Sequence, residues 1–444
     1  MSHRKKTKRD LTFHQRVLGT LGLLLLYRLL SHVPLPFVDA DVVQALISGN
    51  AGLKLFDMLT GGNLGNMSVV ALGITPYITA SILMQLLGVL IPSLAKMQRE
   101  GSTGQKQYKR ISLILAVVLG GFQSVGMVYG YGKQGVLSDF TWYTVLIPAA
   151  IMVMGVFVLS YMGQYIDDHF FGNGISLLLA CGILCSYVED AIVLGTALTT
   201  GKTLPVFVLV CVTAFVFVFF LFVFTTWLTV CEKRIPVTYA TKLSGGSLKQ
   251  SGEIPLKLIG GSVVPIIFAS SIITFPSLIQ SFFGTDVKWL RMFDMNHWLN
   301  PKEPLASAGL GLYLLLIVWF SYYYQALNLN EQEIALQLKQ RGGVIPGIRP
   351  GLSTEVYLQK QMQWLTLLGG LCLCVIAVLP LLVSKGIQVS SLSFFGTSII
   401  ITVSVIYETK ERYVSESQAG RYKGSLFGAK CRYVKRKAGV GHGR

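Results

Sequence analysis

The chain has 444 residues, of which 52% are apolar and only 13% are charged. Because soluble domains carry about 25% charged residues, this composition excludes an ordinary soluble protein and indicates a chain that crosses a membrane several times. The net charge of +17 is not by itself a sign of nucleic-acid binding, since the inner loops of membrane proteins are rich in Lys and Arg and face anionic lipid.

Ten apolar segments are separated by short charged stretches, and all but the short last one are long enough to span about 30 Å of hydrocarbon. Each is predicted to be helical, because backbone groups without a partner are costly in lipid and these segments lack the alternation of barrel strands. We therefore predict an all-α polytopic membrane protein. The segments lie at 14–33, 74–92, 111–131, 142–164, 174–196, 205–231, 258–283, 305–328, 362–384 and 392–407.

The predicted helices divide into five and five, in 1–200 and 201–409, followed by a basic tail at 410–444. An odd number of crossings in each half inverts the second half relative to the first, and this architecture leaves a central pathway between the halves. Placing the amino terminus inside assigns 29 Lys and Arg residues to the inner side and 7 to the outer loops. Both termini are therefore predicted to be cytoplasmic. The first segment is not predicted to be a signal peptide that is removed, because no small-residue cleavage site follows it.

The stretch "FDMLTGGNLGNMSVVALGITPYITASILMQLL", 56–87, is the most irregular segment at membrane level. Gly61, Gly62 and Gly65 interrupt it, and Gly73–Pro76 interrupts it again before a clean helix begins. Irregular backbone at this depth is tolerated only against protein or a watery cavity. We predict a short re-entrant element, a full helix and an internal pore. The alternative is an outer loop that lies on the surface.

Two inner loops, 232–257 and 331–361, are longer than helix hairpins require, so they offer room for a partner. The second contains "QRGGVIPGIRPG", 340–351, in which two prolines forbid a helix and flank a single arginine, Arg349. This pattern predicts a stiff loop that presents Arg349 on the inner side.

Several kinds of chemistry lack their usual residues. Within the ten segments, Asp and Glu occur only as Glu189 and Asp190 toward the end of the fifth, which disfavours an ion-coupled carrier. The stretch "GTALTTGKT", 195–203, resembles a phosphate-binding loop but has one residue too many between its glycines. The seven Cys and six His are scattered, so neither a metal site nor a cofactor site is predicted. An enzyme is disfavoured for the same reason.

Ten motifs, in order and covering nearly the whole chain, resemble the SecY family, the channel-forming subunits of the bacterial and plastid protein translocase. They are "LYRLLSHVPLP" (26–36), "FDMLTGG" (56–62), "LGITPYITASILMQLL" (72–87), "EGSTGQKQYKR" (100–110), "GNGIS" (172–176), "KRIPVTYA" (233–240), "PLKL" (255–258), "PIIFASSIITFP" (265–276), "IPGIRPG" (345–351) and "FGTSIII" (395–401). The resemblance implies a clamshell of ten helices that passes unfolded polypeptide outward and releases hydrophobic segments sideways into lipid.

The same resemblance implies roles for particular positions. A plug at about 56–68 would close the outer funnel and includes Phe56, Asp57, Met58, Leu59, Thr60, Gly61 and Gly62. A pore ring of branched apolar side chains, which would exclude water and ions, would consist of Ile74, Ile78, Ile175, Leu179, Ile267 and Ile401.

A lateral gate would lie between the helices at 74–92 and 258–283, with 111–131 and 305–328 at its edges. Its polar residues would be Thr79, Ser81, Gln85, Gln123, Ser124, Ser270, Ser271 and Thr274. Weak polar contacts between helices would hold it shut, and the alternative for each hydroxyl is a bond to the preceding turn of its own helix.

The implied docking residues for a motor or a ribosome are Arg234 and Arg349, whose guanidinium groups suit carboxylate or RNA phosphate. The implied partners are SecE-like and SecG-like membrane subunits, the SecA motor ATPase, a translating ribosome, signal peptides, nascent polypeptides and membrane lipids. The implied location is the bacterial cytoplasmic membrane, with the thylakoid membrane as the alternative.

Two loops depart from the family pattern. The tip "KLSGGSLKQSGE" is short and weakly basic, and "YIDDHFFGN", 165–173, lacks the usual basic residue. These departures leave a dedicated accessory channel or insertase open beside the general channel. An ion- or solute-coupled secondary transporter is the other alternative.

Overall fold

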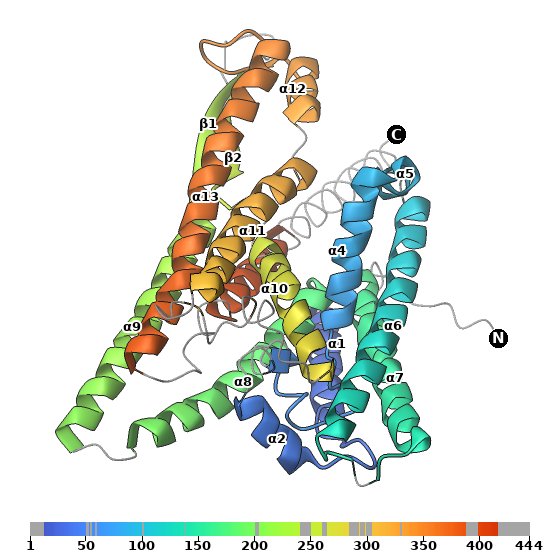
Figure 1. The fold of residues 1–444 in the computed structure, drawn as a ribbon. Coiled ribbons are helices and arrows are strands. Elements are labelled where there is room, and N and C mark those ends of the chain that lie inside the picture. The colour runs from blue at the N-terminus through green and yellow to red at the C-terminus, as the bar shows by residue number, and fades with distance from the viewer. Residues whose placement is uncertain are drawn as a thin grey trace, which may run out of the picture.

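The computed structural model describes residues 13–49, 53, 56–57, 60–99, 102–137, 139–199, 204–239, 250–259, 264–283, 293, 298, 304–328, 331–387 and 398–415. Helices dominate these residues (Figure 1). In chain order they are α1 (Phe13–Leu30), α2 (Ala40–Gly49), α4 (Thr75–Leu90), α5 (Pro92–Arg99), α6 (Ser102–Lys133), α7 (Trp142–His169), α8 (Gly174–Thr199), α9 (Leu204–Val230), α10 (Val264–Phe283), α11 (Pro304–Asn328), α12 (Glu331–Gln340) and α13 (Leu352–Ile387). Residues 398–415 are also helical.

Every predicted apolar segment overlaps one of these helices. Their starts follow from local sequence: Pro76 stands in the first turn of α4, where a missing N–H costs nothing, and Thr141 with Thr144 forms a capping box at α7. The short helices α2, α5 and α12 were not predicted, because they are too short to show as membrane segments.

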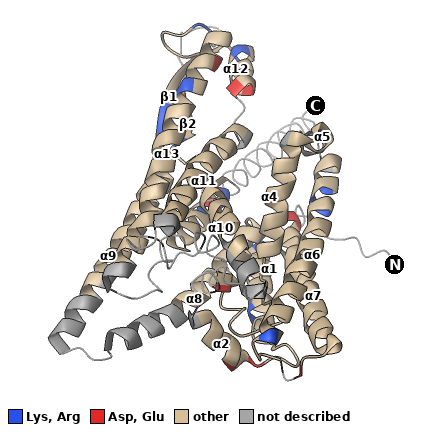
Figure 2. Cartoon of the chain, viewed as in Figure 1, with Lys and Arg blue, Asp and Glu red and all other residues tan. Residues whose placement is uncertain are grey.

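Within the described residues, four helical stretches are long and apolar enough to cross a membrane. They are Thr103–Lys133, Trp142–His169, Ser307–Gln340 and Leu352–Val383. Large apolar side chains are exposed along several helices, among them Phe122 on α6 and Phe215 on α9. Charged residues lie mainly toward the helix ends and around α12 and β1 (Figure 2). Such apolar faces suit surroundings of hydrocarbon.

The helices form one continuous sequence of contacts. α9 packs on α13, α13 on α11, α11 on α10, and α10 on both α4 and α6. In Figure 1, α10 and α11 accordingly lie in the middle, between α9 with α13 on one side and α4, α6 and α7 on the other. The main apolar core runs through this interface and includes buried residues from both halves of the sequence.

The prediction of an all-α fold was wrong in one respect. An antiparallel sheet of order β2-β1-β3 is formed by β1 (Glu232–Tyr239), β2 (Gln250–Lys257) and β3 (Gly343–Val344). In β1, Ile235 and Val237 are buried while their neighbours are exposed, the alternation of a strand with one covered face. These residues belong to predicted loops outside the hydrocarbon, where the requirement for helix does not apply.

The sheet has a small apolar core of its own. Residues from both long loops and Met362, which follows the second loop, supply it: Ile235, Val237, Leu256, Leu338, Ile345, Leu358 and Met362. We call β1, β2, β3, α12 and the start of α13 the sheet module. The two loops that were predicted separately therefore form one folded unit.

Candidate functional site: an apolar core between two halves

The six side chains of the predicted pore ring all belong to the main apolar core. They come from four elements: α4 and the residue before it, α8, α10 and the helix at 398–415. Ile74, Leu179 and Ile401 are buried, and the other three are partly buried against that core: Ile78, Ile175 and Ile267. The fold thus brings residues more than 300 positions apart, Ile74 and Ile401, into a single cluster at the interface of the halves.

The stretch predicted as a plug lies inside the first half, with Phe56 and Thr60 almost completely buried. The hydroxyl of Tyr27 on α1 donates to the carbonyl of Thr60 at 3.1 Å, and Asn63 Nδ2 donates to the Tyr27 oxygen at 2.9 Å. Asp57 Oδ1 accepts from the amide of Gly65 at 2.8 Å. Irregular backbone here is therefore satisfied by protein groups, as membrane depth requires. Met58 and Leu59 lie outside the described residues.

Gly61 is the tightest point of this stretch. It has a positive φ of 83°, and a Cβ placed on it would lie 2.5 Å from Cα of Gly182 on α8. Gly62 also has a positive φ, 76°. L-residues rarely adopt this conformation, so the glycines allow the plug stretch to turn against α8.

The predicted gate helices are in contact, because α10 packs on α4 and α6. Most of the predicted polar side chains, however, bond within their own helices. Thr79 donates to the Thr75 carbonyl, Ser124 to Gly121, Ser270 to Ile267, and Gln85 Nε2 to Ser81 Oγ. These are the local bonds named above as the alternative for hydroxyl groups.

Two predicted gate residues stand apart from this pattern. Gln123 on α6 is 9% exposed, and its Oε1 has no hydrogen-bond partner in the described part of the chain. Ser271 on α10 is half-buried. The side chain of Thr274 lies outside the described residues.

Among the hydrogen bonds that join the halves and that sequence reasoning missed, one lies between the predicted gate helix α4 and α11. The hydroxyl of Tyr323 on α11 donates to the main-chain carbonyl of Gln85 on α4 at 2.9 Å. The acceptor is a peptide group, which every residue has, so the sequence contains no signal for this contact.

The two predicted docking arginines differ in their surroundings. Arg234 on β1 is paired with Glu232 at 2.8 Å and lies 3.7 Å from Glu253 on β2. Arg349 is exposed, and its carbonyl accepts from Thr354 Oγ1 at 2.9 Å. Ile345, four residues earlier, is buried in the core of the sheet module. The loop is therefore anchored at both sides of the exposed guanidinium group.

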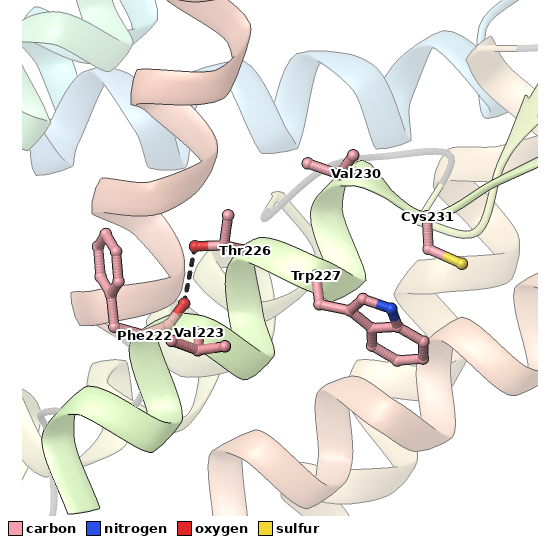
Figure 3. Close-up of a pocket in the computed structure, with 6 residues that line it drawn as sticks. All are labelled: Phe222, Val223, Thr226, Trp227, Val230 and Cys231. Carbon is pink, nitrogen blue, oxygen red and sulfur yellow. Dashed lines mark hydrogen bonds between the residues drawn. The ribbon is translucent and has the colours of Figure 1, made fainter. Parts of the chain in front are cut away.

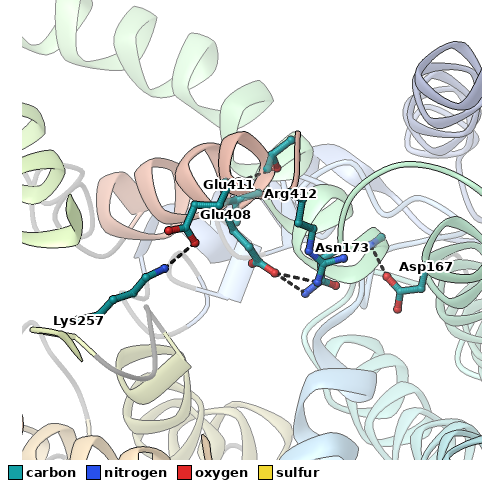
Figure 4. Close-up of polar contacts among 9 residues, drawn as sticks. Asp167, Asn173, Lys257, Glu408, Glu411 and Arg412 are labelled. Atoms are coloured by element: carbon teal, nitrogen blue, oxygen red, sulfur yellow. Dashed lines mark hydrogen bonds and ion pairs between the residues drawn. The ribbon is translucent and has the colours of Figure 1, made fainter. Parts of the chain in front are cut away.

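The helix at 398–415 touches both halves through charged side chains (Figure 4). Asn173, before α8, donates to Glu408 Oε1 at 3.3 Å, and Arg412 pairs with the same oxygen at 3.1 Å. On the other side, Lys257 of β2 pairs with Glu411 at 2.5 Å. Asp167 fixes the start of α8 by accepting from the amide of Gly174 at 2.7 Å. None of these contacts was predicted.

An open apolar groove of about 490 Å³ lies along the end of α9 (Figure 3). It is lined by Phe222, Val223, Thr226, Trp227, Val230 and Cys231. The one polar side chain of α9 there, Thr226, donates to the Phe222 carbonyl at 2.7 Å and so adds no free donor to the groove. This lining suits lipid chains rather than a polar substrate. No group of three or more possible metal ligands occurs among the described residues.

Comparisons with known proteins agree with this architecture. The SecY family model matches residues 68–410. The chain is 34% identical over 422 residues to the protein translocase subunit SecY of Escherichia coli K12, with 93% of each chain covered. It is 33% identical over 439 residues to the protein of that name from Mycobacterium tuberculosis, covering 94% of this chain and 98% of the other.

Solved structures share the fold. A protein-conducting channel aligns with 94% of this chain and 95% of its own length, with a TM-score of 0.64 and 16% identity. Sec61 in the canine ribosome-channel complex aligns with 94% and 95%, with a TM-score of 0.61 and 16% identity. Fold and matches define the class: an integral membrane protein that forms a protein-conducting translocation channel. The chain belongs to the SecY family.

Proposed function

We propose that this chain conducts unfolded secretory polypeptides across the membrane through a constriction formed by the six ring residues, and releases hydrophobic segments into lipid through a lateral gate. The observation that supports this proposal is that all six side chains belong to the main apolar core, in which residues from both halves pack together. Ten membrane-spanning helices in two inverted halves, 1–200 and 201–409, surround the constriction, and 410–444 is a basic tail.

The ring acts as a seal because of its side-chain chemistry. Branched apolar groups make no fixed hydrogen bonds, so they can close around any passing side chain while dewetting excludes water and ions. The plug, about 56–68, adds a second barrier. Its ties to Tyr27 on α1 and its close packing on Gly182 of α8 support a position inside the first half at rest.

The lateral gate lies where α10 meets α4 and α6, with α11 at its edge. Since most hydroxyl groups there bond within their own helices, contact between the gate helices is mainly apolar. The gate helices can therefore separate when a hydrophobic signal segment inserts between them and replaces their apolar contacts. Two predicted gate side chains, Gln85 and Gln123, each have a buried Oε1 without a hydrogen-bond partner in the described part of the chain. An entering segment or water can donate to these oxygens.

The sheet module is the docking surface for the SecA motor ATPase or a translating ribosome, with Arg349 as the exposed contact. Acidic residues are confined to the end of one predicted span, Glu189 and Asp190, so ion coupling within the membrane is disfavoured and we expect an external source of energy. The sheet module is the proposed site at which a motor or a ribosome supplies it. SecE-like and SecG-like subunits complete the complex. The distribution of Lys and Arg supports a cytoplasmic position for both termini and the sheet module. The proposed location is the bacterial cytoplasmic membrane.

The direct test is site-specific crosslinking of a stalled secretory chain. A photoreactive probe at Ile78 or Ile267 is expected to capture the chain during translocation. A probe at Phe122, which is 87% exposed on α6, serves as the matched control and is expected to capture lipid or nothing. Capture at Phe122 without capture at Ile78 and Ile267 would exclude the constriction as the path.

A dedicated accessory channel is the second candidate, and one observation favours it. Arg234 is paired with acidic residues of its own sheet, so it offers less free charge for docking than an unpaired arginine would. Replacing the resident SecY of a host cell with this chain distinguishes the two: growth supports a general channel, and export limited to a few substrates supports the accessory one.

A further inference from the structure

α11 connects the two sides of the predicted gate, although its position in the sequence places it at the gate's edge. It packs on α10, and Figure 1 shows the two helices side by side in the middle of the molecule. Phe268 of α10 makes edge-to-face contacts with Phe320 and Tyr324 of α11, with centroids 5.5 and 5.4 Å apart. These buried rings join α10 and α11 into one unit.

Tyr323 ties this unit to α4. Its hydroxyl donates to the Gln85 carbonyl at 2.9 Å, and its ring stacks on Trp319 of the same helix, 5.9 Å away between centroids. The stack orients the hydroxyl toward α4. The Gln85 side chain donates to Ser81 of its own helix and also hydrogen-bonds to Tyr324 of α11. The acceptor of the Tyr323 bond is the main-chain carbonyl, so a substitution at position 85 leaves that acceptor in place.

We propose that the Tyr323 hydroxyl is a specificity-determining group of the gate, which sets how hydrophobic a signal segment must be to open it. The inference rests on the proposed function. Separation of α4 from the α10–α11 unit breaks this hydrogen bond, and the Tyr323 hydroxyl and the Gln85 carbonyl then lose a partner. An incoming segment must compensate for the lost bond through its own transfer into lipid.

The expected size of the effect follows from hydrogen bonds between membrane helices. Loss of one such bond changes the ratio of closed to open gate by roughly threefold. This is comparable to exchanging about one Ala for Leu in the signal segment. Removing the hydroxyl should therefore lower the hydrophobicity threshold by about one such step.

Tyr322 supplies a matched control on the same helix. Its hydroxyl donates to the Gln363 carbonyl at 3.4 Å, on α13, which belongs to the same sequence half. Tyr322→Phe and Tyr323→Phe therefore make the same chemical change, one within the second half and one between the halves. Each variant keeps its aromatic ring, so packing is retained.

The test uses the full chain, reconstituted with its partner subunits, and a series of signal segments with increasing Leu content fused to one exported reporter. Tyr323→Phe is expected to export the reporter with about one Leu fewer than the wild type needs, and Tyr322→Phe to match the wild type. Equal thresholds for the two variants would overturn the inference. Failure of the wild type with the most hydrophobic signal would instead contradict the proposed function.

A second measurement does not depend on export. Spin labels at Leu83 on α4 and Leu315 on α11, both accessible side chains, report the separation of the two helices in the resting complex. Tyr323→Phe is expected to increase the population at longer distance by roughly threefold, while Tyr322→Phe leaves the distribution unchanged. An unchanged distribution in Tyr323→Phe would count against the proposal even if export changed.

Discussion

Asn173 and Glu408 are 235 positions apart, yet Asn173 Nδ2 donates a hydrogen bond to Glu408 Oε1 at 3.3 Å. This contact attaches the last described helix to the first half of the chain. Three residues further along that helix, Glu411 pairs with Lys257 of β2. The helix at 398–415 therefore bridges the start of α8 and the sheet module.

We expect Asn173 and Glu408 to be thermodynamically coupled. Both are partly exposed, so the coupling should be about 0.5–1 kcal/mol, equivalent to roughly 1–2 °C in a protein of this size. A double-mutant cycle with Asn173→Ala and Glu408→Gln, followed by the apparent melting temperature in detergent, measures it. The matched cycle pairs Asn173→Ala with Glu411→Gln and should show no coupling. Equal coupling in both cycles would mean that the helix responds as a whole rather than through this contact.

Contacts of this kind mark the limit of prediction from sequence. The apolar segments were predictable because lipid permits only helices for a spanning chain, and each segment overlaps a helix. The irregular stretch from 56 to 74 was predictable from Gly61, Gly62 and Gly73, whose positive φ values the structure shows. Periodicity alone did not identify the pore-ring positions, because a branched residue in an apolar helix looks the same whether it faces lipid, core or pore.

Other features were missed for definite reasons. The alternation of Ile235 and Val237 in β1 is visible in the sequence, but eight residues in a presumed loop are a weak signal beside long apolar segments. The Tyr323 bond ends on a carbonyl of α4, and Asn173 meets Glu408 only after the whole chain has folded. Side-chain identity cannot show such pairings.

Gly61 should be sensitive to any Cβ. Gly61→Ala combines the cost of a positive φ, about 1–2 kcal/mol for an L-residue, with a contact of 2.5 Å to Gly182. We expect the plug stretch to move away from α8 and the resting ion conductance of the reconstituted channel to rise. Gly135→Ala is the control, because Gly135 also has a positive φ, 82°, but has no atom within 4 Å of its Cβ position. Equal conductance in the two variants would argue that the plug stretch does not seal the channel.

Arg349 should be required for motor-driven export. Arg349→Glu places a negative charge at the exposed tip of an anchored loop and removes the proposed contact between Arg349 and SecA. Because a reversed charge at an interface is strongly unfavourable, we expect SecA-driven export to fall at least about tenfold. Arg341→Glu is the control, since Arg341 is also exposed in the same loop. Membrane abundance of both variants should equal that of the wild type. Normal export by Arg349→Glu would remove the docking role of this residue.

Ile267 should contribute to the seal through its apolar surface rather than its shape. Ile267→Val retains the branched group, loses one methylene, and is expected to cost about 0.5–1.5 kcal/mol of stability without ion leak. Ile267→Asn introduces hydrogen-bonding groups that hold water in the constriction, so we expect ion conductance to rise while the protein remains in the membrane. Ile272→Asn makes the same change on α10 at a position that is 38% exposed, and it should leave the channel tight. Ion conductance in planar bilayers distinguishes the three variants. An ion leak of equal size from Ile272→Asn would show that α10 as a whole, and not the ring position, controls the barrier to ions.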